Sequence, residues 1–440
     1  MTKILFIEPP KDANIAESRS KDYEYITPLW ALALATYLKE RIPNLKIKII
    51  DGRIGKFGET KEIIEEIKEQ KPDFIGISPK FTNYSNALEA ARVGKKVGAK
   101  IILGGAHALH LRKEILTQRG PNSADYCIDA IVQFDGERAL YEYISGKPLS
   151  KINNLVYCQN NKIKENPIVN LNLDSLPVCN RDFLNLKRDY FKKRRTLIIY
   201  SQKGCSWREK TGGCLFCALM DISLRLRDPE KIWQEINFLN KKYHLDSIWD
   251  SAENLLSDLG WFYRYHKISF KYPQKPGMKI FMRMDRVNEE TAKMLKDLKV
   301  IEAIVGIESG CPLTLKTMRK GEAVEQNRRA IELLHRCGVK TFHCFILGAP
   351  EESKKTILET MNFIKELNKD KKNITGTRIN VLMPFPGSCA WQMLVERTGQ
   401  KYKGKDMIDW REVSRDWIKN FCNISLQDFG KMLEKARKLI

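Results

Sequence analysis

Short apolar runs alternate with stretches of helical periodicity over the first 147 residues. Lys3–Glu8 is an apolar run closed by Pro9-Pro10, as expected of a buried strand, and Trp30, Leu34 and Leu38 then recur at helical spacing. Strands separated by helices form βαβ units, so the pattern predicts an α/β domain over residues 1–147 with a flavodoxin-like, doubly wound parallel sheet. The expected strands are Lys3–Glu8, Lys46–Ile50, Phe74–Ser78, Lys100–Leu103 and Ala130–Phe134.

A ligand site is expected where these strands end. Doubly wound sheets bind ligands at the carboxyl ends of their strands, and glycine lets the backbone approach a bulky ligand closely. The residues at these ends are Ser78, Gly104-Gly105 and Gly136-Glu137. All of them are also ordinary turn residues, so by themselves they indicate only a sheet with room for a planar cofactor at one edge.

Residues 148–195 break this rhythm. Leu155-Val156-Tyr157 lies between Asn-rich turns and predicts a small hairpin, and the segment that follows predicts a linker. The densest basic cluster of the chain lies there: Lys187, Arg188, Lys192, Lys193, Arg194 and Arg195.

The alternation of strands and helices resumes over residues 196–389. About six βα units are too few for a closed eight-unit barrel, so the pattern predicts an open, partial (β/α)6 barrel. Barrel enzymes gather their chemistry at the carboxyl ends of the strands, where Asp250, Glu308 and Gly348 fall. A small helical region is expected over residues 390–440.

Charge and cysteine content narrow the class of protein. The 440 residues carry a formal net charge of +22, which favours a solvated Lys-rich surface and leaves a polyanionic partner open. Neither a secretory signal nor an apolar stretch long enough for a membrane span is visible, so an intracellular, cytoplasmic protein is expected. In that compartment the eleven cysteines are thiols or metal ligands rather than disulfides.

Three cysteines follow the apolar strand Thr196–Ser201 within one glycine-containing loop. They are Cys205, Cys214 and Cys217. Thiolates at such short spacings hold iron–sulfur clusters, and three protein ligands leave one iron of a [4Fe-4S] cluster open to bind a small molecule. The alternative is a zinc site, but a second Cys/His pair at knuckle-like spacing is missing.

The cysteine motif resembles that of the radical S-adenosylmethionine (SAM) enzymes, with Phe216 in the place of the aromatic residue that precedes the last cysteine. The first gap is eight residues instead of three. Gly306–Gly310 resembles the GxExG stretch of radical SAM enzymes that carry an N-terminal cobalamin (B12) domain, and Pro384–Ser388 resembles their PYPGT element. The resemblance covers about residues 1–425.

This resemblance implies roles for single residues. Asp250, Glu253 and Glu308 would hold the SAM amino group or ribose, and Arg283 would meet the SAM carboxylate. Ile346 and Gly348, in the pattern Ile-x-Gly-x-x-Glu, would pack against the adenine. These residues and Phe216 make up the expected SAM site.

The resemblance also implies cobalamin in the first domain, beside Ser78, Gly104, Gly105, Gly136 and Glu137. The motif Asp-x-His-x-x-Gly of many cobalamin domains is absent, because Asp51–Gly55 contains no histidine. No such histidine is therefore expected as the lower ligand. His107 and His110 follow Gly104-Gly105, so a role beside the corrin stays open, although a surface or helix-start role is the plainer interpretation of both.

A cobalamin-dependent radical SAM methyltransferase that acts on an unactivated carbon is therefore the leading hypothesis. A reductant such as flavodoxin or ferredoxin would serve it, and a peptide or small molecule is the favoured substrate over nucleic acid. Three alternatives remain: radical cyclisation or rearrangement without methyl transfer, RNA modification, and a zinc-containing nucleic-acid-binding protein.

Overall fold

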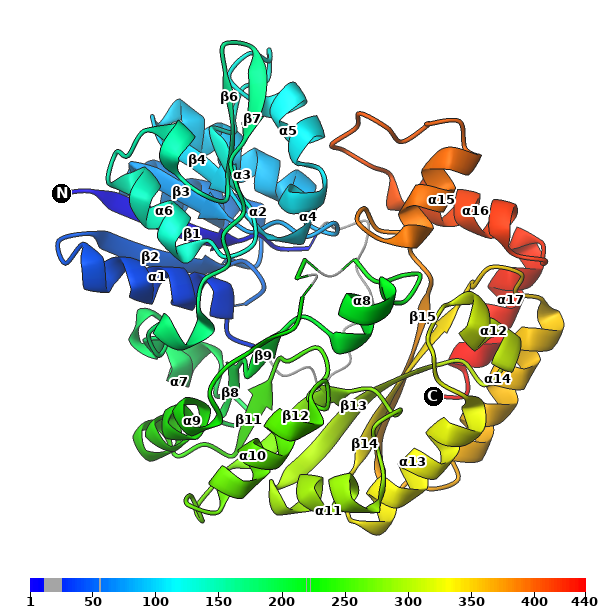
Figure 1. Ribbon diagram of the computed structural model, residues 1–440. Coiled ribbons are helices and arrows are strands. Elements are labelled where there is room, and N and C mark those ends of the chain that lie inside the picture. Colours follow the sequence, from blue (N-terminus) through cyan, green and yellow to red (C-terminus); the bar gives the residue numbers. More distant parts are fainter. Residues whose placement is uncertain (12–25, 55–56, 219, 222) are drawn as a thin grey trace. The chain divides into compact units, whose positions relative to one another are not determined.

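The structure is a computed structural model that describes residues 1–11, 26–54, 57–218, 220–221 and 223–440. Two compact units make up the chain (Figure 1). The first unit contains Met1–Arg194 and Lys403–Ile408, and the second contains Arg195–Tyr402 and Asp409–Ile440. Among the helices that the structure describes, none is long and apolar enough to cross a membrane.

The first unit is built on a seven-stranded sheet in the order β2-β1-β3-β4-β5-β6-β7. Neighbours from β2 to β5 are parallel, whereas β6 and β7 form an antiparallel hairpin that pairs with β5 and extends the sheet. The strands are β1 (Lys3–Glu8), β2 (Lys46–Asp51), β3 (Phe74–Ile77), β4 (Lys100–Leu103), β5 (Ala130–Val132), β6 (Leu155–Gln159) and β7 (Lys162–Glu165).

Helices cover both faces of this sheet, because successive strand residues point to opposite sides. Leu5 and Ile7 of β1 belong to the core under α2, α3 and α5, and Ile4 and Phe6 belong to the core under α1 and α6. The predicted doubly wound, flavodoxin-like sheet is thus confirmed. The helices are α1 (Leu29–Arg41), α2 (Thr60–Gln70), α3 (Tyr84–Lys96), α4 (Gly105–His110), α5 (Arg112–Arg119), α6 (Glu137–Ile144) and α7 (Leu186–Asp189).

The second unit contains six parallel strands in the order β15-β14-β13-β12-β11-β8, which confirms the predicted partial barrel. A two-stranded antiparallel ladder of β9 and β10 flanks the cysteine loop. The strands are β8 (Thr196–Ile199), β9 (Gln202–Lys203), β10 (Arg225–Leu226), β11 (Ser247–Asp250), β12 (Gly277–Met282), β13 (Val300–Glu308), β14 (Thr341–Leu347) and β15 (Ile374–Val381).

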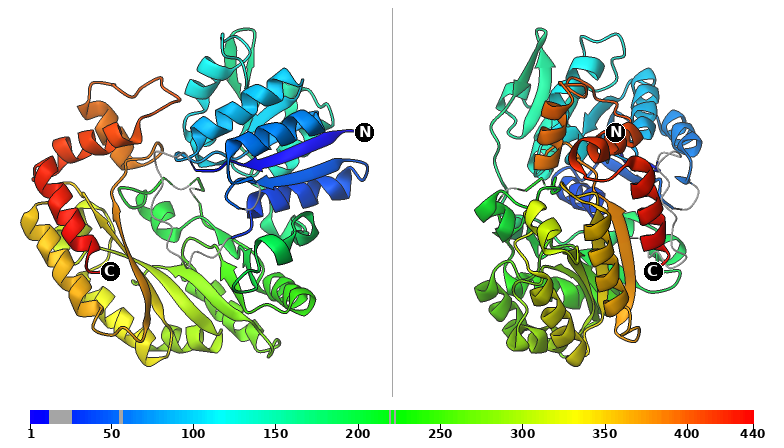
Figure 2. Two further views of the ribbon diagram at one scale, coloured as in Figure 1. Left: turned by 180° about the vertical axis from the view of Figure 1, so that it is seen from behind. Right: turned by 90° about the vertical axis from the view of Figure 1, so that its right-hand side faces the viewer.

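Helices cover the outer side of this curved sheet (Figure 2). Residues of β14 that face them, such as Phe345 and Leu347, are fully buried. The helices are α8 (Ser206–Thr211), α9 (Pro229–Tyr243), α10 (Leu259–Ser269), α11 (Glu289–Asp297), α12 (Pro312–Thr317), α13 (Val324–Arg336), α14 (Lys354–Leu367), α15 (Cys389–Arg397), α16 (Trp410–Phe421) and α17 (Leu426–Arg437). Of these, α15, α16 and α17 form the helical C-terminal region.

Candidate active site

The three cysteines lie in one segment that follows β8 and β9. Cys205 follows β9 and is the N-cap residue of α8. Gly212 and Gly213 have φ angles of 83° and 91° and end this helix, and the chain then turns back to Cys214. The backbone N–H of Cys217 donates to the carbonyl of Cys214 at 3.0 Å. The eight-residue gap between the first two cysteines is therefore a short helix closed by two left-handed glycines.

The chemistry of this loop fits a four-iron cluster. All three thiols are free and half-buried. In the described ranges, no three His, Cys, Asp or Glu side chains converge on a site for a single metal ion. The ligands of a four-iron cluster bind different iron atoms, so they need not converge in that way. Because thiolates are the ligands that such clusters use, the donor set of this loop is compatible with a four-iron cluster.

Arg283 connects Cys214 to the end of β12. Its Nη1 lies 3.9 Å from the Cys214 Sγ, and its Nη2 donates to the Lys320 carbonyl at 2.8 Å. Its guanidinium also lies 3.5 Å from a carboxylate oxygen of Glu322. Burial raises the pKa of the Cys214 thiol to about 11, although the positive charges of Lys320 and Arg283 act in the opposite direction.

A buried ion pair of Lys320 and Glu308 lies in the same network. The two side chains are 3.1 Å apart, and Glu308 has a φ of 64° at an irregularity in the pairing of β13 with β14. Burial disfavours the charge on Lys320, yet attraction to Glu308 and Glu322 outweighs burial and raises the lysine pKa. Gly306 makes room for this pair, because an added Cβ would lie 2.4 Å from Glu308 and 3.0 Å from the Lys320 ammonium.

Trp207 of the inserted helix α8 packs on this network. Its ring covers the guanidinium of Arg283, and its indole N–H donates to the Arg319 carbonyl at 3.1 Å. Gly321 has a φ of 71°, and a Cβ there would lie 2.2 Å from the Trp207 ring. Lys320, Glu322 and the role of Trp207 escaped the sequence analysis. The signal that could have located them is the run Met318–Glu322, two opposite charges around a glycine in a loop between helices.

Asp250 and Glu253 contact the backbone near the cysteine loop instead of this network. Asp250 is fully buried, and its Oδ1 accepts the N–H groups of Ser201 at 3.0 Å and Ala252 at 3.1 Å. Burial raises the pKa of Glu253 to about 7, and the N–H of Gly204, the residue before Cys205, donates to its carboxylate. Both acids thus accept hydrogen bonds from the backbone of Ser201–Gly204, the segment that leads to Cys205.

The expected SAM contacts Ile346, Phe216 and Gly348 differ in exposure and in packing. Ile346 is half-exposed on the inner side of β14, and Phe216 is half-exposed between Cys214 and Cys217. Gly348 has a φ of 96°, its carbonyl accepts the Trp417 indole N–H at 2.7 Å, and a Cβ there would lie 2.9 Å from Ile418. Gly348 is therefore required by the packing of α16 against the end of β14.

Ser78 and the paired glycines lie together at the carboxyl ends of β3 and β4. Gly105 opens α4 with a φ of 80°, and a Cβ there would lie 2.5 Å from the Ser78 hydroxyl. At Gly104 an added Cβ would meet the Val132 carbonyl oxygen at 3.8 Å, an ordinary van der Waals contact. Gly136 and the buried Glu137 begin α6 after β5. These residues fit the close approach of a planar cofactor to the backbone.

His107 is buried next to these glycines. Its ring lies between Phe81 and Tyr84, with centroid distances of 5.2 Å and 4.0 Å. Neither ring nitrogen has a hydrogen-bond partner among the described residues, and burial lowers the pKa of this histidine to about 3. The structure therefore places His107 in an apolar layer as a neutral imidazole, and not on the surface.

Family models match both units. The B12 binding domain matches residues 20–144, and the Radical SAM superfamily matches residues 199–364. The uncharacterized methyltransferase PH0819 of Pyrococcus horikoshii is 24% identical and spans 99% of this chain and 91% of its own length. The anaerobic magnesium-protoporphyrin IX monomethyl ester cyclase of Rubrivivax gelatinosus is 24% identical over 90% of this chain and 70% of its own.

Two groups of solved structures share the fold over most of the chain. The cobalamin-dependent radical enzyme OxsB with aqua-cobalamin and SAM bound has a TM-score of 0.73 at 18% identity, and the match covers 99% of this chain and 66% of that one. The radical SAM methyltransferase TsrM of Kitasatospora setae, with tryptophan and a SAM analogue bound, has a TM-score of 0.71 at 16% identity over 90% of this chain and 76% of that one.

Proposed function

This chain belongs to the radical SAM enzymes that carry a B12-binding domain, and from this premise we propose that it is a cobalamin-dependent methyltransferase acting on an unactivated carbon. When bound, the cluster and SAM supply a 5′-deoxyadenosyl radical for hydrogen abstraction, and cobalamin supplies a transferable methyl group. The observation that carries the proposal is that one chain holds both a three-thiol loop at the strand ends of a partial barrel and a Gly-Gly pair at the strand ends of a flavodoxin-like sheet.

We propose that the second unit binds the cluster and SAM. Cys205, Cys214 and Cys217 bind three irons, which leaves the fourth for SAM. Arg283 and Glu308 have charges opposite to those of the carboxylate and the ammonium of SAM. Each already has a protein partner in the network around Cys214, which SAM would share. Asp250 and Glu253 keep the loop in place, and Phe216 and Ile346 present apolar surface to the adenine.

We propose that the first unit binds the corrin. Since the chain lacks the motif Asp-x-His-x-x-Gly, no histidine of that motif would serve as the lower ligand. Gly104 and Gly105 let the backbone approach the cofactor closely, with Ser78, Gly136 and Glu137 at the neighbouring strand ends. Radical SAM enzymes need an external reductant. A flavodoxin or ferredoxin in that role, and with it a cytoplasmic location, belong to this proposal.

The names of relatives favour methyl transfer first and cyclisation second. PH0819 is called a methyltransferase, as is TsrM, whereas the Rubrivivax relative is called a cyclase. Radical cyclisation without methyl transfer is therefore the second candidate. A product heavier than its substrate by one methylene separates the first function from the second.

Cofactor content is the decisive experiment. Protein purified without oxygen and supplied with hydroxocobalamin is expected to hold about four irons and one cobalt per chain. The triple variant Cys205→Ala/Cys214→Ala/Cys217→Ala is expected to lose the iron and keep the cobalt, because the two cofactors belong to different units. Cys337→Ala, at the end of α13, is the matched control and is expected to keep both. Iron without cobalt would remove the methyl-transfer mechanism, and zinc without iron would overturn the enzyme assignment.

A further inference from the structure

The inner face of the partial barrel is lined by residues that alternate with the buried ones. In β14, Thr341, His343, Phe345 and Leu347 are buried towards the helices, and Phe342, Cys344 and Ile346 keep partial exposure on the opposite face. Side chains inside a closed eight-stranded barrel fill it completely. Six strands do not close, and the partial exposure of these side chains leaves part of the inner face accessible.

The strand register shows which side chains share this face, because paired residues of parallel neighbours point to the same side. One row crosses the sheet as Phe281, Ile304, Phe342 and Gly376. The next row towards the carboxyl ends contains Gly306, Cys344 and Arg378. The row on the other side contains Trp249, Lys279 and Glu302.

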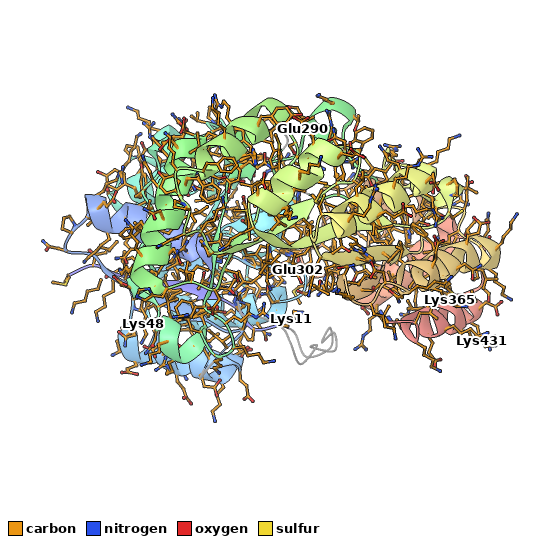
Figure 3. The ribbon with its side chains drawn as sticks, turned by 90° about the horizontal axis from the view of Figure 1, so that it is seen from below. Lys11, Lys48, Glu290, Glu302, Lys365 and Lys431 are labelled. Carbon is orange, nitrogen blue, oxygen red and sulfur yellow. The ribbon has the colours of Figure 1, made fainter. Side chains whose placement is uncertain are left out.

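Three cations of this face and of the strand ends are paired with acids. One is Arg283 at the end of β12, which lies 3.2 Å from Asp285. Lys279 lies 3.7 Å from Glu302, and Lys320 lies 3.1 Å from Glu308. Figure 3 labels Glu302 within the second unit, and it labels Lys365 and Lys431 on helices at the periphery. Only a cation without such an acid can offer its full charge to a ligand.

Arg378 is a further cation of this face, with an exposed side chain beside an aromatic ring. Its guanidinium carbon lies 5.6 Å from the centroid of Phe342, and in the part of the chain described here no carboxylate pairs with it. Gly376 lets the ring lie close to β15, because a Cβ at that position would be 2.6 Å from the Phe342 ring. An arginine held by a ring keeps its N–H fork available for a carboxylate or a phosphate.

We propose that Arg378 binds an acidic group of the substrate and that Phe342 and Phe281 contact its flat, apolar part. The substrate is thus an anion, carrying a carboxylate or a phosphate beside a planar or unsaturated body. This inference rests on the proposed function in one respect, since the inner face of the barrel is taken as the place of the substrate. It adds the chemical class of the substrate and a residue that selects it.

Cys344 provides a reporter inside the proposed site. It pairs with Arg378 in the register of β14 and β15, and its thiol is half-buried on the same face. The test measures the rate at which neutral iodoacetamide alkylates Cys344 in the full-length, cluster-reconstituted protein, by peptide mass spectrometry. Benzoate, phenyl phosphate and benzyl alcohol serve as probes, because they share a ring and differ in charge and in acidic group.

Benzoate or phenyl phosphate is expected to slow the alkylation of Cys344 saturably, and whichever protects better identifies the preferred acid. Benzyl alcohol is expected to protect at least about tenfold more weakly, the range of one charge-assisted pair of hydrogen bonds. Arg378→Gln is expected to reduce protection by the anions to the level of benzyl alcohol, and Arg378→Lys to retain part of it. Arg329→Gln, on the exposed face of α13, is the matched control and keeps full protection.

Equal protection by benzyl alcohol and the anions, or undiminished protection in Arg378→Gln, would overturn the proposal. The Arg378→Gln protein is compared with the wild type at equal iron content, so that a loss of protection reports on the side chain and not on the fold. Where Gln disturbs the fold, Arg378→Lys takes its place in the comparison. The measurement needs no turnover. Protection by anions in a chain that takes up no cobalt would contradict the proposed function alone, and cobalt uptake without protection would contradict this inference alone.

Discussion

The indole ring of Trp207 covers the guanidinium of Arg283, whose central carbon lies 4.8 Å from the ring centroid. Since Arg283 also reaches the thiol of Cys214, the inserted helix α8 connects the first gap of the cysteine motif to a cation beside the second cysteine. The longer gap therefore has a structural consequence: it places a ring that restricts where this guanidinium can lie.

Replacing this ring is expected to change the electronic properties of the cluster. Trp207→Ala frees Arg283, and a cluster that loses a hydrogen bond and a nearby positive charge has a lower reduction potential. Redox titration followed by electron paramagnetic resonance, on samples matched for iron content, is expected to show a more negative midpoint potential. Trp391→Phe, in α15, is the control and should leave the potential unchanged. A wild-type potential in Trp207→Ala would show that the ring does not position Arg283.

Gly321→Ala is expected to produce the same spectroscopic change by a different route. Its Cβ would lie 2.2 Å from the ring of Trp207, and the residue has a φ of 71°, so the ring must move and the backbone is strained. Combining Gly321→Ala with Trp207→Ala removes the clash. The double variant is therefore expected to match Trp207→Ala in potential, and a further shift in the double variant would contradict this coupling.

The fold class followed from the sequence because its signals are local. Apolar runs and helical spacing are contained in short windows, so the doubly wound sheet and the partial barrel followed from them. The cysteine motif was equally local, within Cys205–Cys217. The run Met318–Glu322 is a local signal too, but it does not give the partner of Lys320, because Glu308 is brought to it by an irregularity in β13 and a left-handed backbone. The role proposed for Arg378 depends on the register of β14 with β15, which the sequence does not give.

Removing Lys320 is expected to destabilise the second unit strongly. Lys320→Met leaves Glu308 buried without its partner, and breaking a buried pair in this way costs about 3–5 kcal/mol. The double variant Lys320→Met/Glu308→Gln removes both charges and is expected to recover most of that loss. Urea denaturation followed by tryptophan fluorescence reports on this unit, because every tryptophan except Trp30 belongs to it. Equal losses in the single and double variants would contradict the ion pair as the cause.

Asp406 fixes a late segment of the chain to the first unit. This aspartate is fully buried, and it accepts hydrogen bonds from Arg119 at 2.7 Å and from the Tyr84 hydroxyl at 3.0 Å. Asp406→Ala is expected to release residues 403–408 and to speed tryptic cleavage after Lys403 and Lys405 at least several-fold. Asp409→Ala, the N-cap of α16 in the second unit, is the control. An unchanged cleavage rate in Asp406→Ala would show that other contacts hold the segment.

Glu352 gives the second unit a predictable dependence on pH. This side chain is buried and accepts the N–H groups of Gly348 and Ala349. Burial raises its pKa from 4.5 to about 7, although the two backbone donors act in the opposite direction. Between pH 4.5 and 7 the folded protein keeps a proton that the unfolded chain has lost, so this carboxyl makes the unit less stable as the pH rises.

Protonated Glu352 contributes at most about 3 kcal/mol to the free energy of unfolding below pH 4.5. This contribution is lost as the pH rises to about 7. Glu352→Gln carries no charge at any pH, and its amide oxygen still accepts the two N–H groups. Its stability, measured by urea denaturation from pH 5 to 8, is therefore expected to fall less with pH than that of the wild type and to exceed it above pH 7. Glu332→Gln, on the exposed face of α13, should follow the wild-type curve. Parallel curves for wild type and Glu352→Gln would mean that the two backbone donors, and not burial, determine the charge of this side chain.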